Sequence, residues 1–112
     1  LSGKVVLIDF AIYSAEGFSS HNLELRNLYS QYQQKGLEIY QISLDANEHY
    51  WKTTADKLPW ICVRDPQGQY STLVKTFAVE SIPAMFIVDR NNDIVGRAGS
   101  LEGLEAAFKK YL

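Results

Sequence analysis

Residues 4–10 (KVVLIDF) constrain the fold of this chain more than any other stretch. They form a continuous apolar run that closes on Asp9 and Phe10. Such a run is typical of a central strand that is covered on both faces, because a strand with one wet face alternates apolar and polar residues. The following segment, 9–20 (DFAIYSAEGFSS), passes through small and polar residues toward a helix start. In α/β proteins this strand-to-helix connection commonly carries the functional residues.

The rest of the chain predicts the order β-α-β-α-β-α-β-β-α. Apolar residues at helical spacing predict the helices, and short apolar or alternating runs predict the strands. We expect Ser19, Ser20 or Asn22 to cap the first helix, Gly36 to end it, and Ser100 to cap the last one. The predicted strands are 4–10, 37–44, 60–63, 84–89 and 94–98, and the predicted helices contain residues 25–32, 50–58, 70–77 and 101–111.

Composition and charge fit one globular domain, residues 1–112. The net charge is −2 and no block of Lys or Arg occurs, which argues against nucleic-acid binding through a basic surface. No apolar run is long enough to cross a bilayer. Because the sequence opens at Leu1, almost inside a strand, we expect it to be a trimmed piece of a longer chain. One cysteine, Cys62, excludes an internal disulfide and a cysteine-rich metal site.

Three segments carry a family resemblance. Residues 3–28 (GKVVLIDFAIYSAEGFSSHNLELRNL) resemble the opening of thioredoxin-like proteins, most closely the periplasmic TlpA-type thiol-disulfide oxidoreductases and the related alkyl hydroperoxide reductase and thiol-specific antioxidant (redoxin) group. Residues 81–89 (SIPAMFIVD) resemble the family's cis-proline segment, and residues 92–100 (NDIVGRAGS) its final hairpin strand. The resemblance implies an α/β, thioredoxin-like fold with a central mixed β-sheet flanked by helices on both faces.

The same resemblance places the two redox cysteines of the family on Ala15 and Phe18, with Glu16 and Gly17 between them. No cysteine lies in residues 1–61, so a shifted alignment restores neither thiol. Dithiol exchange needs a thiolate at the helix start and a resolving thiol beside it. The loop therefore resembles an active-site loop that has lost its catalytic residues, and we assign it none.

A binding role needs no sulfur. In the family, the backbone before the cis proline pairs with an extended peptide, strand to strand. We expect a protein or extended peptide to bind an apolar groove with an exposed Phe18. The alternatives are that Phe18 turns inward and closes the groove, and that Pro83 only sets a turn. The residues of this predicted binding surface are Tyr13, Ser14, Phe18, Trp60, Ile82 and Pro83.

The remaining candidates favour structural roles. The resemblance matches Asp9 to the buried acid of active thioredoxins, and here we expect a satisfied carboxylate at a strand end. His21 is expected to face solvent, since Glu16, Glu24 and His49 give it no recognised metal-binding spacing. Cys62 is expected to be a small buried apolar residue; a redox-sensing thiol near Arg64 is the alternative. Nothing in the pattern predicts a metal or cofactor.

The function expected from this reasoning is a redox-inactive thioredoxin-like domain that serves as a protein- or peptide-binding or scaffold module of the cell envelope. The periplasmic or envelope location rests on the family resemblance alone. The alternative is a thiol-disulfide oxidoreductase or redoxin-type antioxidant enzyme that relies on Cys62 or on residues outside this sequence. The oligomeric state stays open.

Overall fold

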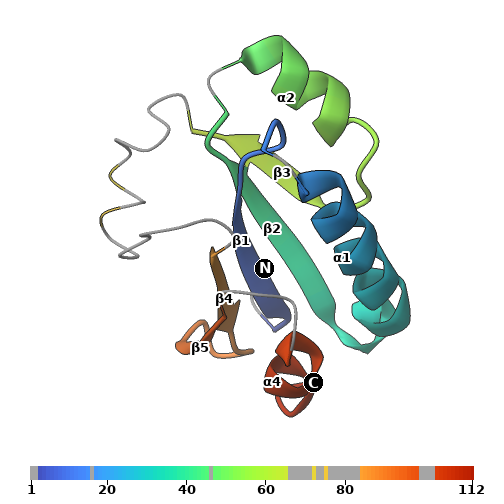
Figure 1. Cartoon of the computed structure of the whole chain (residues 1–112). Helices are drawn as coiled ribbons and strands as arrows, with labels where there is room; N and C mark the ends of the chain where they lie inside the picture. Colours follow the sequence, from blue (N-terminus) through green and yellow to red (C-terminus); the bar gives the residue numbers. More distant parts are fainter. Residues whose placement is uncertain are drawn as a thin grey trace.

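The computed structural model describes residues 3–15, 17–45, 47–65, 72, 75, 84–98 and 103–112. Within these ranges the chain forms a mixed five-stranded sheet with helices packed beside it (Figure 1). The strands are β1 (Val5–Ala11), β2 (Leu37–Ser43), β3 (Ile61–Arg64), β4 (Ala84–Val88) and β5 (Ile94–Ala98). The helices are α1 (Phe18–Tyr32), continued by the short 3-10 helix η1 (Gln33–Lys35), α2 (Glu48–Ala55) and α4 (Leu104–Lys109).

The apolar run at the start of the chain forms the middle strand. The sheet order is β3-β2-β1-β4-β5, with β1 parallel to β2 and antiparallel to β4. Strand β3 is parallel to β2, and β5 is antiparallel to β4. Every residue of β1 is buried except Ile8, which is partly buried. The predicted central position of residues 4–10 and the mixed sheet are both confirmed.

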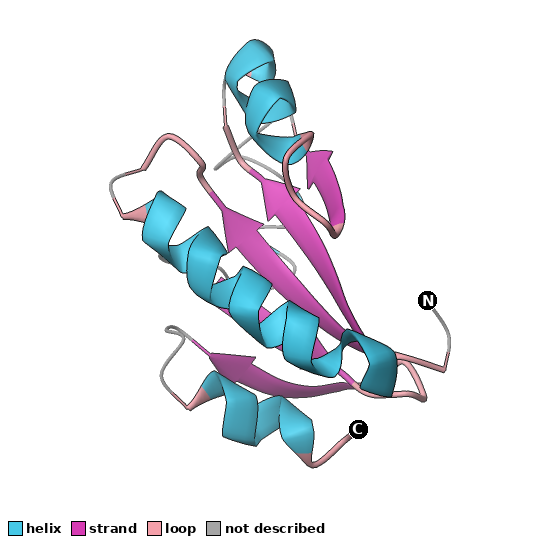
Figure 2. Ribbon diagram, turned by 90° about the vertical axis from the view of Figure 1, so that its right-hand side faces the viewer, coloured by secondary structure: helices cyan, strands magenta, loops and turns pink. Residues whose placement is uncertain are grey.

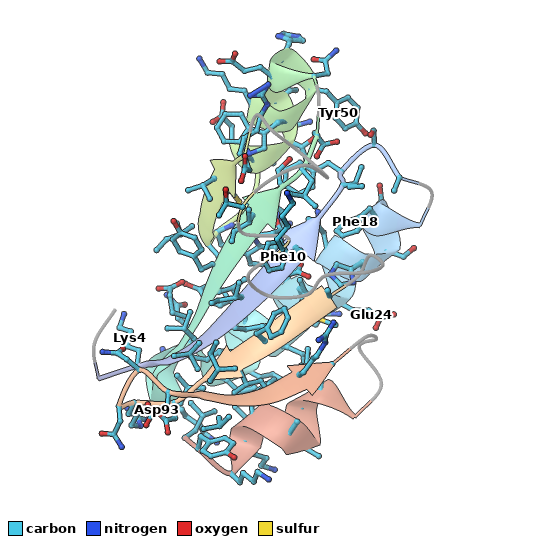
Figure 3. The ribbon with its side chains drawn as sticks, turned by 90° about the vertical axis from the view of Figure 1, so that its left-hand side faces the viewer. Lys4, Phe10, Phe18, Glu24, Tyr50 and Asp93 are labelled. Carbon is cyan, nitrogen blue, oxygen red and sulfur yellow. The ribbon has the colours of Figure 1, made fainter. Side chains whose placement is uncertain are left out.

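The two faces of the sheet carry separate apolar clusters. Helices α1 and α4 lie on the same face, as Figure 2 shows, over a core that includes Leu7, Leu25 and Phe108. The opposite face, viewed in Figure 3, carries a second cluster with Phe10 near its centre, packed edge-on against Phe86 with ring centroids 6.0 Å apart. The helix predicted around residues 70–77 lies mostly outside the described residues.

The ends of α1 differ in how well they were predicted. Gly36 ends the helical segment in the left-handed conformation, with φ of 106°, as expected. The predicted cap is wrong: the residue before α1 is Gly17, with φ of 85° and no side-chain cap. Ser19 and Ser20 are exposed in the first turn, and Asn22 is buried. Ser100 and Pro83 fall outside the described residues, so their predicted roles stay predictions.

No helix within the described ranges is long and apolar enough to cross a membrane.

Arg90 ties three distant segments together at the end of the sheet where β1 begins. Its Nη1 donates to the carbonyl of Gly3 at 2.7 Å, and its Nη2 donates to the carbonyls of Lys35 at 3.0 Å and Leu112 at 3.4 Å. The guanidinium also lies against Gly36, where a Cβ atom would stand 2.9 Å from Nη2. Gly36 is therefore required both for its positive φ and for the close approach of Arg90.

This geometry separates two glycine substitutions. Gly36→Ala and Gly17→Ala each place a side chain at positive φ, which costs about 1–2 kcal/mol. Gly17 has open space around it, whereas Gly36→Ala must displace the Arg90 guanidinium, which donates to three backbone carbonyls. We expect Gly36→Ala to lower the free energy of unfolding by about 1–2 kcal/mol more than Gly17→Ala. Urea denaturation of both variants measures the difference, and equal losses would show that Arg90 moves aside freely.

Candidate functional site

The loop between β1 and α1 is held by one buried carboxylate, that of Asp45, just past the end of β2. Its Oδ2 accepts from the backbone N–H of Tyr13 at 2.8 Å and from the Ser43 hydroxyl at 2.6 Å. Its Oδ1 accepts from the backbone N–H of Ser14 at 3.1 Å and from the Ser14 hydroxyl at 3.0 Å. Four donors satisfy this carboxylate, so the loop is fixed to the sheet before α1 begins.

Phe18, the first residue of α1, points into the protein. Its side chain is 5% exposed, and its ring lies 6.4 Å from that of Tyr13 and 4.6 Å from that of His21, measured between centroids. Figure 3 labels Phe18 at the start of α1, and Trp51 of α2 packs partly against the same cluster. The expectation of an exposed Phe18 is wrong, because the ring fills the apolar space between the loop and α2.

The predicted binding residues are not all brought to the surface. Tyr13 and Trp60 are 4% and 6% exposed, whereas Ser14 is exposed and Ala15 is partly buried. Ile82, Pro83 and Glu16 lie outside the described residues. Whether a peptide binds beside this loop therefore stays a prediction.

Beneath the first turns of α1, a row of polar side chains crosses three strands. In the strand register, Asp9 of β1 pairs with Gln41 of β2, and Gln41 pairs with Cys62 of β3. All three side chains belong to the face that α1 covers, because Asp9 and Gln41 bond to residues of that helix. Asp9 and Gln41 are completely buried, and Cys62 is partly buried.

Gln41 is the centre of this row. Its Nε2 donates to Asp9 Oδ2 and to Asn22 Oδ1, each at 2.8 Å. Its Oε1 accepts from the Tyr13 hydroxyl at 2.6 Å and from the Trp60 indole N–H at 3.1 Å. Both donor and both acceptor positions of the amide are thus used. The side chain joins the loop, α1 and the segment before β3.

His21 was predicted to face solvent, and that prediction is wrong. The side chain is 8% exposed, and its Nε2 lies 2.9 Å from Asp9 Oδ2. The ring is turned inward because position 21 lies one turn after Phe18, on the face of α1 above the sheet. The burial of Asp9 is confirmed, but the carboxylate is only half satisfied, since its Oδ1 has no hydrogen-bond partner.

Burial sets the protonation of the remaining groups. It raises the pKa of Tyr13 well above its ordinary value, and the neighbouring Cys62 thiol adds to this effect. The Tyr13 hydroxyl therefore stays protonated and donates to Gln41. Burial also raises the pKa of Cys62, with the charge of Asp9 acting in the same direction, although hydrogen bonds to Tyr13 and Trp60 oppose it. The site thus keeps its one thiol in the unreactive, protonated form.

This arrangement positions hydrogen bonds but holds no reactive thiol pair. No group of three or more His, Cys, Asp or Glu side chains within the described ranges is placed to hold a metal ion. Sequence reasoning missed Gln41 and Asp45, and assigned Asn22 to a cap. The polar Gln41 at an inward position of the apolar run 37–44 was the available signal, because buried amides require partners.

The Asp9–His21 contact predicts a strong stability effect. His21→Ala leaves the buried Asp9 carboxyl group with Gln41 as its remaining partner, so the free energy of unfolding should fall by about 1–3 kcal/mol. His49 of α2 is exposed and offers a matched control, for which His49→Ala should change stability by less than about 0.5 kcal/mol. Urea unfolding at neutral pH compares the two. Similar small losses would show that the Asp9–His21 hydrogen bond contributes little to stability.

The raised pKa of Cys62 predicts alkaline destabilisation. The unfolded chain loses the thiol proton near the ordinary value of 9.0, while the folded protein keeps it. The unfolded state then binds fewer protons, so the free energy of unfolding falls as pH rises through and above that value. Denaturation between neutral pH and about pH 10 should show a smaller fall for Cys62→Ser, whose hydroxyl does not ionise. Parallel curves would show that the thiol is not held protonated by the fold.

Comparisons with known proteins agree with the fold. A family model described as thioredoxin-like matches residues 3–94. A solved thioredoxin-like protein from Bacteroides vulgatus is 51% identical, with a TM-score of 0.87 over 96% of this chain and 71% of that one. A thiol-disulfide oxidoreductase from Bacteroides fragilis is 26% identical, with a TM-score of 0.86 over 99% of this chain and 83% of that one.

Two further relatives are similar in sequence. Nucleoredoxin from Xenopus laevis is 27% identical over 93% of this chain, which covers 26% of nucleoredoxin. Tryparedoxin from Trypanosoma brucei brucei is 29% identical over 85% of this chain and 67% of its own length. The sheet order, the strand-to-helix loop and the matched family model lead to one conclusion: this chain belongs to the thioredoxin-like family, and its structural neighbours include thiol-disulfide oxidoreductases.

Proposed function

We propose that this domain binds protein or extended peptide segments without exchanging thiols. The observation that carries the proposal is the occupancy of the two cysteine positions implied by the family resemblance. Ala15 stands at the first and Phe18 at the second, and the Phe18 side chain is 5% exposed and packed inward. A thiolate and a resolving thiol are both required for dithiol exchange, and neither position supplies one.

The surroundings of the loop support a fixed rather than a reactive role. Asp45 holds the backbone of Tyr13 and Ser14, and Gln41 joins the Tyr13 hydroxyl to α1. Preorganised loops on rigid elements are typical of binding surfaces, because little conformational freedom is lost when a partner docks. The cell envelope is the compartment that we propose, on the resemblance to periplasmic family members.

A second candidate is a thiol-disulfide oxidoreductase that uses Cys62 or residues outside this sequence. The names of the relatives favour it, since they include a thiol-disulfide oxidoreductase and tryparedoxin. The geometry opposes the Cys62 version. The thiol is only partly exposed, its pKa is raised by burial, and it contacts the Trp60 carbonyl at 3.7 Å and Gln41 Oε1 at 3.9 Å.

An insulin-reduction assay tests the proposal. We expect the native domain and Cys62→Ser to reduce insulin no faster than the reductant alone. The double variant Ala15→Cys with Phe18→Cys is the positive control, because thiols at a helix start have lowered pKa values. Circular dichroism checks that this variant folds. Activity of the native domain that disappears in Cys62→Ser would overturn the proposal and establish the second candidate.

Binding is measured separately with carboxymethylated insulin B chain, an extended peptide without free thiols. We expect it to shift backbone amide resonances of the ¹⁵N-labelled domain at micromolar to millimolar concentrations. If no resonance shifts, the proposed binding role is wrong, whereas the result of the insulin-reduction assay still stands.

A further inference from the structure

One side of α1 forms a wall of a surface groove. The opposite wall is the segment from the end of α2 to β3. A hollow of about 280 Å³ lies toward the start of the helix, and a second of about 390 Å³ lies toward its end. Both are lined by Arg26, Lys57 and Leu58, so they form one continuous surface. The helix residues that line it are Ser19, Asn22, Leu23, Arg26, Tyr29, Ser30 and Gln33.

The length of the groove suits a short peptide segment. Its helical wall runs from Ser19 to Gln33, which at the rise of an α-helix spans about 20 Å. An extended chain of about six residues covers that distance. Arg26 crosses the middle, where its Nη2 donates to the carbonyl of Lys57 at 2.6 Å. Figure 1 shows the connection from α2 to β3 passing beside the upper part of α1.

The groove has a cationic centre. Arg26 and Lys57 are both exposed, and within the described part of the chain neither is paired with a carboxylate. Asp56 is the one acidic side chain that lines the surface. Two cations against one anion leave a positive surplus here, although the whole chain carries a net charge of −2. An acidic segment is therefore the electrostatic complement of this surface.

The groove also offers apolar area beside its charges. Leu23 is 60% exposed, the highest value among the exposed large apolar side chains of the described residues. Leu58 is partly buried on the opposite wall, and Tyr29 lies at the floor with 5% exposure. An exposed leucine flanked by cations matches a segment that combines acidic residues with an aliphatic one.

From these observations we propose that the groove between α1 and residues 54–59 is a docking surface for an acidic, leucine-containing segment of a partner protein. The inference rests on the proposed binding function, because it names a partner class and a surface for it. The surface is separate from the β1–α1 loop and uses none of the residues that replace the cysteines. Acidic side chains would pair with Arg26 and Lys57, and an aliphatic side chain would cover Leu23.

The probe is the hexapeptide Ac-EELEEL-NH2, with Ac-KKLKKL-NH2 as the charge-reversed control. Titrated into the ¹⁵N-labelled domain, the acidic peptide should shift amides of residues 19–33 and 54–59, and the basic peptide should not. Affinity should fall as salt is added, because exposed charges are screened. Arg26→Glu and Lys57→Glu should each weaken binding by about fivefold to tenfold, as expected for exposed ion pairs that become repulsive.

Matched controls distinguish binding in the groove from a general effect of surface charge or of exposed apolar side chains. Lys109→Glu on α4 makes the same charge change at a residue that does not line the groove, and should leave affinity within about twofold. Leu23→Ser should weaken binding, whereas Ile94→Ser, at 56% exposure on β5, should not. Lys57→Glu is the second variant in case Arg26→Glu fails to fold. It removes the cation at residue 57 but keeps the backbone carbonyl to which Arg26 donates.

Three outcomes would overturn the inference: no shifts with the acidic peptide, shifts confined to other surfaces, or equal effects of groove and control variants. If carboxymethylated insulin B chain binds while the acidic peptide does not, the proposed binding function stands and this docking surface fails. If neither peptide binds, the proposed binding function and this docking surface are both wrong.

Discussion

The buried amide of Gln41 is the interaction on which the arrangement of this domain depends. It lies on the second strand, under α1, and its four hydrogen-bond positions are taken by Asp9, Asn22, Tyr13 and Trp60. Leaving one such group unpaired in the interior costs about 1–3 kcal/mol, so these elements must meet in a single geometry. Apolar burial is non-directional, whereas the four hydrogen bonds of this amide are all formed in one position of α1 over the sheet.

The start of α1 shows what the loss of the cysteine pair means physically. The positions that the family resemblance assigns to reactive thiols are occupied by Ala15 and by Phe18, which is buried. Burying a phenylalanine stabilises a fold by about 1.5–3 kcal/mol relative to leaving it exposed. Functional sites commonly retain backbone strain that stability alone would remove. Within the described residues, the one non-glycine residue with positive φ is Asn92, in the turn between β4 and β5, far along the chain from this loop.

Much of the fold follows from the sequence because burial directly selects the apolar pattern. The run 4–10 predicted the central strand, and the helical spacing around Leu25 predicted α1. The predicted cap at the start of α1 was wrong for a different reason. A serine near a helix start fits the capping pattern in many positions, and here Gly17 precedes the helix without a side-chain cap. The position of His21 was missed because its partner Asp9 depends on how α1 sits over the sheet. That docking is a tertiary property that spacing along one helix does not contain.

The Asp9–His21 pair explains why a buried carboxylate is retained although the two cysteine positions carry no thiol. Asp9 has one oxygen paired with His21 and Gln41 and the other without a partner. Removing Asp9 alone would leave His21 and the amide of Gln41 buried without their acceptor. Removing His21 alone would leave the buried Asp9 carboxyl group with Gln41 as its remaining partner, which also costs stability. Replacing the whole set by apolar side chains of similar volume can be neutral or stabilising, but no single substitution leads there without loss. Each single substitution in the network is therefore destabilising. This cost is enough to retain the network, which needs no catalytic role.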